Sequence, residues 1–352
     1  MIKWIGVVVL CWLTVQAPAQ DSLKYWVTFT DKANNGYSYT EPEAFLSARA
    51  IDRRTKQNIP FTIQDEPVSP LYVDGLRQLG FTVLHTSRWF NAATVSTNDP
   101  MLIQQAGSLP YVRATDTVAK LKLADELELS YTAEKIRTAK MRYEYGEGFN
   151  QIRMLNGDLL HDEGYTGKGL LIAVLDAGFP QVNTLSGFSK LREEGRLLGG
   201  RDFVDPGTSI YEDHPHGTVV LGTMAAFLPN VMIGTAPEAQ YLLLRTEDAT
   251  SEMTIEEANW VAAAEYADSV GADILNTSLG YTTFDDSTMN HTYADMNGNA
   301  TLITRGADLA AQKGMLVVNS AGNSGGRAWQ YVGAPADGDS VFTIGAVTPE
   351  GG

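Results

Sequence analysis

A buried strand that ends in an aspartate constrains the fold of this chain most. Residues 170–175 are six consecutive apolar residues, and they lead directly into Asp176, Ala177 and Gly178. A short, continuous apolar run is typical of a strand that is buried on both faces of a parallel sheet. Gly178 allows a sharp turn after the strand. Asp176 then lies at the carboxyl end of the strand, where ligands and chemistry gather in open α/β sheets. Asp176 is a candidate site residue, with helix capping as the alternative.

The second half of the chain alternates apolar strands with helices. We expect strands at residues 169–176, 241–244, 273–280, 315–319 and 341–347, and helices at 154–163, 216–226, 251–270 and 300–312. Ser251 is the expected start of the long helix, and residues 181–212 are expected to be mostly loop. This alternation predicts an α/β domain over residues 151–352, with a parallel sheet flanked by helices on both faces.

The first part of the chain predicts three further segments. Residues 1–20 have a positive start, a short apolar run and a small-residue cleavage site, as a secretory signal peptide does. Residues 21–117 predict a small α+β domain of ferredoxin-like order βαββαβ, if residues 43–70 are an insertion. Its strands are expected at residues 25–30, 81–86, 91–97 and 111–115, and its helices at 43–56, 71–79 and 100–106. Residues 118–150 are charge-rich and are expected to be a linker.

Composition excludes several classes of protein. The net charge is −16 and no basic stripe is present, so no nucleic-acid partner is expected. The apolar run of the signal is too short to span a membrane, and no transmembrane segment is expected. The single cysteine, Cys11, lies in the signal peptide, so the mature protein is expected to have neither disulfides nor cysteine nucleophiles. We expect a secreted protein, extracellular or at the cell surface.

Three residues suited to acyl-transfer chemistry occupy strand ends or helix starts. His216 opens an apolar helix and is followed by Gly217, which lets a substrate approach the backbone closely. A rigidly held histidine suits proton transfer near neutral pH, and Asp176 is the carboxylate that would orient it. Asn323 follows another strand in a small-residue loop, where its amide would donate to an oxyanion.

These motifs resemble those of the subtilases, the subtilisin-like serine proteases. Residues 172–178 resemble the family's aspartate motif, residues 216–226 its histidine motif, and residues 320–323 the segment of its oxyanion asparagine. Residues 276–280, 234–237 and 341–347 also resemble family landmarks, and the order Asp, His, Asn is the family's order. Val219 replaces a second histidine that is usual in the family, and little effect is expected because that position is not the base.

The resemblance implies a serine endopeptidase with an Asp-His-Ser triad. It implies that Asp176 orients His216, that His216 is the general base and that Asn323 binds the oxyanion. It also implies that substrate backbone pairs with an edge strand at Ser278, Leu279 and Gly280, with Ala321 and Gly322 in the binding site. Residues 21–117 resemble the propeptide of secreted subtilases of the Bacteroidetes type, which assists folding and inhibits the zymogen. We expect a monomer that acts on proteins or peptides.

The nucleophile is the main departure from the family pattern. No Gly-Thr-Ser-Met-Ala-like motif follows Asn323, and Ser340 lacks that context. Residues 207–209 read Gly-Thr-Ser, but they precede the histidine and lack the small residues that open the family's helix. We expect the catalytic serine beyond residue 352 and the chain as given to be inactive. Two alternatives remain: a non-catalytic subtilase-like binding domain, and an unrelated doubly wound binding protein in which Asp176 and His216 lie apart.

No cofactor is required by this chemistry, although a structural calcium ion is conceivable. Asp295, Asn297 and Asn299 space oxygen atoms two residues apart around a glycine, as calcium loops do. A polar turn is the favoured interpretation. His214 and His216 are two residues apart, but two histidines alone make a poor metal site. The sequence leaves open the peptide-bond preference, the position of the activating cleavage within residues 118–150, and any signals at the carboxyl end.

Overall fold

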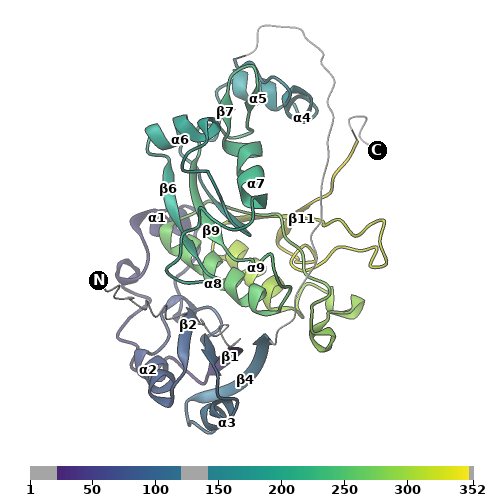
Figure 1. Ribbon diagram of the computed structural model, residues 1–352. Coiled ribbons are helices and arrows are strands. Elements are labelled where there is room, and N and C mark those ends of the chain that lie inside the picture. Colours follow the sequence, from purple (N-terminus) through teal and green to yellow (C-terminus); the bar gives the residue numbers. More distant parts are fainter. Residues whose placement is uncertain (1–21, 120–141, 349–352) are drawn as a thin grey trace, which may run out of the picture.

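The computed structural model describes residues 22–119 and 142–348, which form two domains that pack on each other. The N-terminal domain carries a four-stranded antiparallel sheet, and the C-terminal domain a six-stranded parallel sheet. In Figure 1 the N-terminal sheet lies below helices α8 and α9, and α7 lies on the opposite side of the parallel sheet. The predicted signal peptide and residues 120–141 of the predicted linker lie outside the described residues.

The N-terminal domain has the predicted ferredoxin-like order. Its strand order is β2-β3-β1-β4 with antiparallel neighbours, which is the arrangement of a βαββαβ domain. The predicted helix over residues 43–56 is shorter than expected, because the hydroxyl of Ser47 accepts a hydrogen bond from Ala50 N and starts the helix there. The regular elements are β1 (Leu23–Phe29), α1 (Ala48–Lys56), α2 (Pro70–Leu79), β2 (Thr82–Ser87), β3 (Ala92–Thr97), α3 (Leu102–Gly107) and β4 (Val112–Ala119).

The C-terminal domain confirms the predicted α/β fold. Its main sheet has the order β12-β11-β10-β5-β9-β6, with every neighbouring pair parallel. The strands of that sheet are β5 (Leu171–Asp176), β6 (Leu197–Asp202), β9 (Gln240–Arg245), β10 (Ile274–Thr277), β11 (Leu316–Ser320) and β12 (Val341–Ile344). The helices are α4 (Phe149–Arg153), α5 (Gly157–Asp162), α6 (Ser189–Glu193), α7 (His216–Ala225), α8 (Ile255–Val270) and α9 (Leu302–Gln312), with a small hairpin of β7 (Phe227–Leu228) and β8 (Met232–Ile233).

Strand β5 lies between two hydrophobic cores, as its continuous apolar sequence predicts. All of its residues are buried, and alternate side chains point to opposite faces. Leu171, Ala173 and Leu175 pack in the core formed with α8 and α9. Ile172 and Val174 pack in the core that contains Leu221 of α7 and Leu243 of β9. The position of Asp176 at the end of this strand is therefore fixed from both sides.

The structure differs from the sequence predictions at three places. Residues 181–212 are loop-rich, as expected, but they also contain α6 and the edge strand β6, which were not predicted. The glycines of β6 remove the side-chain pattern that would indicate a strand in the sequence. Gly200 lies so close to β9 that a Cβ there would be 2.0 Å from Leu243 O. Helix α8 begins at Ile255 rather than near Ser251, whose backbone N–H donates to Asp248 O in the preceding turn. The helix predicted at 154–163 is broken by Asn156, which has a left-handed backbone with φ 57°.

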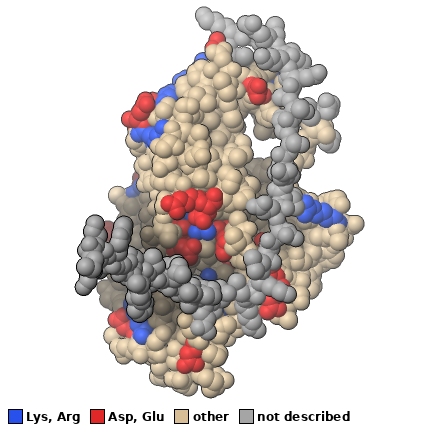
Figure 2. Space-filling view, in the orientation of Figure 1, with Lys and Arg blue, Asp and Glu red and all other residues tan. Residues whose placement is uncertain are grey.

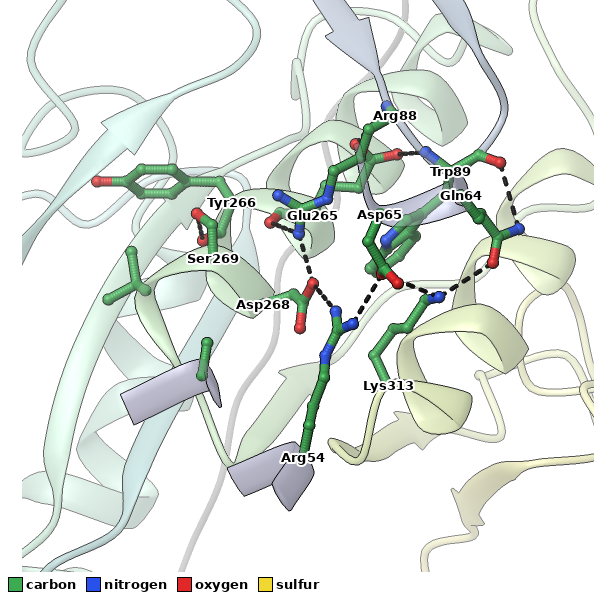
Figure 3. A network of polar contacts seen from close by, with 12 residues as sticks. Arg54, Gln64, Asp65, Arg88, Trp89, Glu265, Tyr266, Asp268, Ser269 and Lys313 are labelled. Atoms are coloured by element: carbon green, nitrogen blue, oxygen red, sulfur yellow. Dashed lines mark hydrogen bonds and ion pairs between the residues drawn. The ribbon is translucent and has the colours of Figure 1, made fainter. Parts of the chain in front are cut away.

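A buried ion-pair network joins the two domains at the carboxyl half of α8. Asp268 is fully buried, and its carboxylate accepts hydrogen bonds from Arg53, Arg54 and Arg88 of the N-terminal domain. Figure 3 shows the contacts of Asp268 with Arg54 and Arg88. Arg54 also donates to the buried carboxylate of Asp65 at 2.7 Å. Burial of these charges is tolerated because each carboxylate has guanidinium partners. The segment that was expected to be an insertion, residues 43–70, supplies two of the three arginines.

Glu265, one helical turn before Asp268, binds the turn between β2 and β3. Its carboxylate accepts hydrogen bonds from the hydroxyl of Ser87 at 2.5 Å and from the backbone N–H groups of Arg88 and Trp89. Figure 3 shows Glu265 beside Arg88 and Trp89. Glu265 is 5% exposed, so these three donors replace water around the carboxylate. The N-terminal domain is thus held by its helix α1 and by its hairpin.

Charged side chains are unevenly distributed on the surface. On the face that Figure 2 shows, Asp and Glu side chains gather in a patch near the middle of the molecule, while Lys and Arg are scattered. Within residues 22–119 and 142–348, no helix is both long and apolar enough to cross a membrane.

The Asp268 network predicts a large loss of stability on Asp268→Asn. Three guanidinium groups would lose their shared carboxylate, and breaking a buried ion pair typically costs about 3–5 kcal/mol. Urea unfolding should show a loss of about this size. The control is Asp52→Asn, which removes the pair of Asp52 with Lys56 on the exposed face of α1 and should cost at most about 1 kcal/mol. Equal effects of the two substitutions would contradict the importance of the network.

His85 of β2 predicts that domain packing weakens in acid. Its Nε2–H donates to Phe203 O of the C-terminal domain at 2.6 Å, and burial lowers the pKa of His85 from 6.5 to about 4. The neutral ring is therefore favoured in the packed state. The resulting stability is present above pH 6.5 and is lost as the pH falls toward 4.

The measurement is urea unfolding at pH 7 and pH 5. The wild type should lose up to about 2 kcal/mol more between these pH values than His85→Phe, which keeps the aromatic contact with Phe203 but cannot titrate. An equal loss in both proteins would show that His85 has no part in the acid response.

Candidate active site

Asp176 and His216 meet at the carboxyl end of β5. Asp176 is fully buried, and its Oδ1 accepts hydrogen bonds from Ala177 N at 2.7 Å and from Nδ1–H of His216 at 2.7 Å. The structure therefore brings together the two residues that the sequence analysis paired across 40 positions of the chain. The proposal of an unrelated fold with distant Asp176 and His216 is excluded by this contact.

Two glycines make this approach possible. Gly178 has φ 148° and forms an isolated bridge with Asp213, so the turn after β5 is bound to the segment that leads into α7. Gly217 lies in the first turn of α7, where a Cβ would be 2.4 Å from Gly178 O and 2.9 Å from the Cβ of Asp176. Only glycine fits there, so the first turn of α7 can pack directly on the end of β5.

The electrostatic environment of His216 suits a general base. The hydrogen bond to Asp176 and the charge of that carboxylate raise the pKa of His216, against the opposing effect of burial, and Glu247 also raises it. The His216 side chain is 40% exposed. Because Nδ1 carries the proton that Asp176 accepts, Nε2 of the neutral ring keeps a free lone pair for a proton from a substrate or a nucleophile.

The predicted oxyanion segment lies at the same edge of the sheet. Thr277 of β10 pairs with Leu175 and with Asn319, so the ends of β5, β10 and β11 are level. Asn323 follows β11 and is exposed. Beside it opens a hollow of about 870 Å³. The lining residues are Tyr293, Met296, Ala321, Gly322, Asn323, Gly325, Gln330, Tyr331, Val332, Gly345 and Ala346.

The residues predicted to form a substrate-binding edge strand are not in a strand. Ser278, Leu279 and Gly280 do not belong to a strand: β10 ends at Thr277, and the chain then runs to an isolated bridge between Tyr281 and Ala334. The carbonyl of Leu279 accepts a hydrogen bond from the side chain of Asn319 at 3.1 Å. Substrate binding by these residues stays a prediction.

The predicted calcium candidates form hydrogen-bonded turns. Asp295 Oδ2 accepts from the backbone and the hydroxyl of Thr292, and Asn297 Oδ1 accepts from Asn299 N. In the part of the chain that is described, no group of three or more His, Cys, Asp or Glu side chains is placed to hold a metal ion. The oxygen atoms of Asp295 and Asn297 thus support the turn, and calcium binding stays a prediction.

The Gly-Thr-Ser run at 207–209 also belongs to a turn. The hydroxyl of Thr208 donates to the carboxylate of Asp202 at 2.8 Å, and the hydroxyl of Ser209 accepts from Tyr211 N at 3.2 Å. Both hydroxyls support local structure, as the sequence context suggested.

The sequence analysis missed a group of buried acidic residues next to the Asp–His pair. Glu247 follows β9, the strand beside β5, and Glu256 lies in the first turn of α8. They are 7% and 2% exposed. The sequence contains a feature that could have indicated Glu247, because it follows an apolar strand. Asp176 is the last residue of its strand, whereas Glu247 lies two residues beyond the end of β9.

Family models match both domains. A model described as the subtilase family matches residues 167–352, and one described as the peptidase S8 propeptide domain of Bacteroidota matches residues 24–135. Subtilisin E of Bacillus subtilis is 29% identical over 245 residues, which cover 67% of this chain and 56% of that protein. The minor extracellular protease Vpr of Bacillus subtilis is 32% identical over 194 residues, covering 53% of this chain and 21% of that protein. The chain thus spans about half the length of subtilisin E.

A solved structure supports the fold. The epidermin leader peptide processing serine protease EpiP from Staphylococcus aureus has a TM-score of 0.55 at 16% identity, covering 94% of this chain and 71% of that one. At this identity the likeness bears on the fold alone.

Gly217→Ala should separate Asp176 from His216. The added Cβ has no space, so the start of α7 must move away from β5. We expect the pKa of His216 to fall, because the hydrogen bond that raises it is stretched. An NMR titration of the ring measures this. The control is Gly222→Ala in the same helix, where a Cβ meets nothing within 4 Å. It should leave the titration unchanged and stabilise the helix by up to about 1 kcal/mol. A normal His216 titration in Gly217→Ala would refute the steric argument.

Proposed function

The chain belongs to the subtilase family, and from that premise we propose that it supplies the acid–base half of a secreted serine endopeptidase. His216 takes a proton from the nucleophilic serine through Nε2, and Asp176 holds the ring by its Nδ1–H and stabilises the imidazolium. The observation that carries the proposal is the 2.7 Å hydrogen bond from His216, whose side chain is 40% exposed, to a fully buried Asp176.

Asn323 is proposed to stabilise the oxyanion. When the serine oxygen attacks the peptide carbonyl, negative charge develops on the carbonyl oxygen, and a fixed amide N–H at that point lowers the barrier. Its loop follows β11 at the same edge of the sheet as Asp176, which supports this role. The neighbouring hollow, with Ala321 and Gly322 in its wall, is proposed to receive a substrate side chain.

We further propose that residues 1–352 are inactive by themselves. No serine among them stands in a Gly-Thr-Ser-Met-Ala-like setting. The nucleophile is expected on a segment that packs beside His216 in the whole protein. Calcium at Asp295, Asn297 and Asn299 is not required for the chemistry.

The N-terminal domain is proposed to act as the intramolecular inhibitor of a zymogen. Two features support this role besides the family match. The domain is bound through the desolvated ion pairs of Asp268. Its last strand, β4, ends where the carbonyl of Val118 accepts a hydrogen bond from the hydroxyl of Thr254 at 3.0 Å, in the loop between β9 and α8. The chain thus leaves the N-terminal domain on the side of the sheet where Asp176 lies.

The proposal predicts serine-dependent proteolysis by the whole protein that carries this chain. It should hydrolyse casein in a reaction that a serine-reactive inhibitor stops. His216→Ala should lower kcat/KM by at least about 10³-fold, because it removes the base. Val219→Ala, at an exposed position of the same helix, is the control and should retain activity within about twofold.

Residues 1–352 should show no turnover in the same assay. Turnover by residues 1–352 would contradict the proposal that the nucleophile lies elsewhere. Absence of proteolysis by the whole protein, or full activity of His216→Ala, would favour the alternative of a non-catalytic binding domain.

A further inference from the structure

Glu247 is a buried carboxyl group beside the Asp176–His216 pair. Thr246 N donates to Asp176 O at 2.9 Å, so the chain that follows β9 is hydrogen-bonded to the catalytic edge of β5 at Asp176 itself. Glu247 is the next residue and is 7% exposed. Its charge raises the pKa of His216, and the charge of Asp176 contributes to raising the pKa of Glu247. The charges of Asp176, His216 and Glu247 therefore influence one another.

The surroundings of Glu247 make its charge costly. The hydroxyl of Thr246 donates to Glu247 Oε1 at 2.9 Å. Glu252 and Glu256, from the loop after β9 and from α8, add further carboxyl groups, and the buried ring of Tyr281 lies on the side of β10. Among the described residues, no Lys or Arg forms an ion pair with Glu247, Glu252 or Glu256. Burial first, then the charges of Glu252 and Asp176, raise the pKa of Glu247 to about 8, although Tyr281 and Thr246 act to lower it.

The carboxylate of Asp176 is also incompletely satisfied. Its Oδ1 has two donors, but its buried Oδ2 has no hydrogen-bond partner among the described residues. A subtilase base needs its imidazolium stabilised at the moment when the serine proton arrives. The His216 ring becomes a cation during the reaction; it is then bound to Asp176, and the charge of Glu247 acts on the same ring.

We propose that Glu247 is a positioning residue, whose buried carboxyl group stabilises the imidazolium that forms when His216 takes the serine proton. This inference rests on the proposed function. The coupling is reciprocal: a charged His216 favours the ionised form of Glu247, and an ionised Glu247 favours a charged His216. The groups that face His216 are Asp176 from β5, His214 from the preceding loop and Glu247. Asp176, Tyr281, Glu252 and Glu256 face Glu247.

Glu247→Gln tests the proposal, because it keeps the shape of the side chain and removes the charge. In an NMR titration of the full chain, the pKa of His216 should fall, because the charge of Glu247 is one of the causes that raise it. The chain has five histidines, and His216→Gln assigns the signal. In the whole enzyme, kcat should fall by about tenfold with little change in KM, and the acid limb of the kcat/KM profile should move to lower pH.

Glu256→Gln is the matched control. Like Glu247, Glu256 is buried, and it belongs to the same group of carboxyl side chains, Glu247, Glu252 and Glu256. Its carboxylate accepts hydrogen bonds from Asp248 N and Met253 N. Glu256 is not among the groups that raise the pKa of His216. The pKa of His216 should therefore stay unchanged in Glu256→Gln.

An unchanged His216 titration in Glu247→Gln would overturn the proposal, as would an equal fall in Glu256→Gln, which would indicate a structural effect. The titration needs no turnover, so it decides on Glu247 even if the whole protein proves inactive. Inactivity of every variant, including the wild type, would count against the proposed function instead.

Discussion

The hydrogen bond between Asp176 and His216 depends on the complete burial of β5. A carboxylate at the end of a strand that is covered on both faces cannot be hydrated, so it must find donors in the protein. Ala177 N and His216 Nδ1–H are those donors. The need to place the second donor explains the glycines at 178 and 217. Gly178 lets the segment before α7 pack on the turn after β5, and Gly217 lets the first turn of α7 approach Asp176. The geometry of the base is thus a consequence of how the central strand is packed.

Charge burial also explains how the two domains stay together. The N-terminal domain offers guanidinium groups from α1 and from the β2–β3 turn, and α8 offers the carboxylates of Glu265 and Asp268. Such a contact is unfavourable if only one partner is present, because the remaining charge is then desolvated without compensation. The interface therefore selects a matched partner. Acid acts at a different point of the same interface, through the neutral His85 ring.

Much of the fold was predictable from the sequence, where local patterns and tertiary environment agree. Strand β5 and helix α7 were predicted because an apolar run and a rigid, apolar helix need no other information. Strand β6 was missed because Gly199 and Gly200 remove its side-chain pattern, although the strand is stabilised by pairing with β9. The ion pair of Arg54 with Asp268 was also beyond prediction, because the two residues are 214 positions apart and each alone resembles a solvated helical side chain.

The residues of the candidate site also divide into those that the sequence predicted and one that it did not. Asp176, His216 and Asn323 were found because each stands in a distinctive local motif, and the contact of the first two is confirmed. Glu247 was missed because an isolated acidic residue in a loop is usually solvated, and its burial depends on Tyr281 and α8, which lie far away in the sequence. The most direct test of the account is the tautomer of His216 at a pH above the pKa of the ring, measured by nitrogen NMR. The account predicts a neutral ring with its proton on Nδ1, bound to Asp176, and a free Nε2. A ring protonated on Nε2 would contradict it, because that ring could neither bind Asp176 through Nδ1–H nor accept a proton from serine.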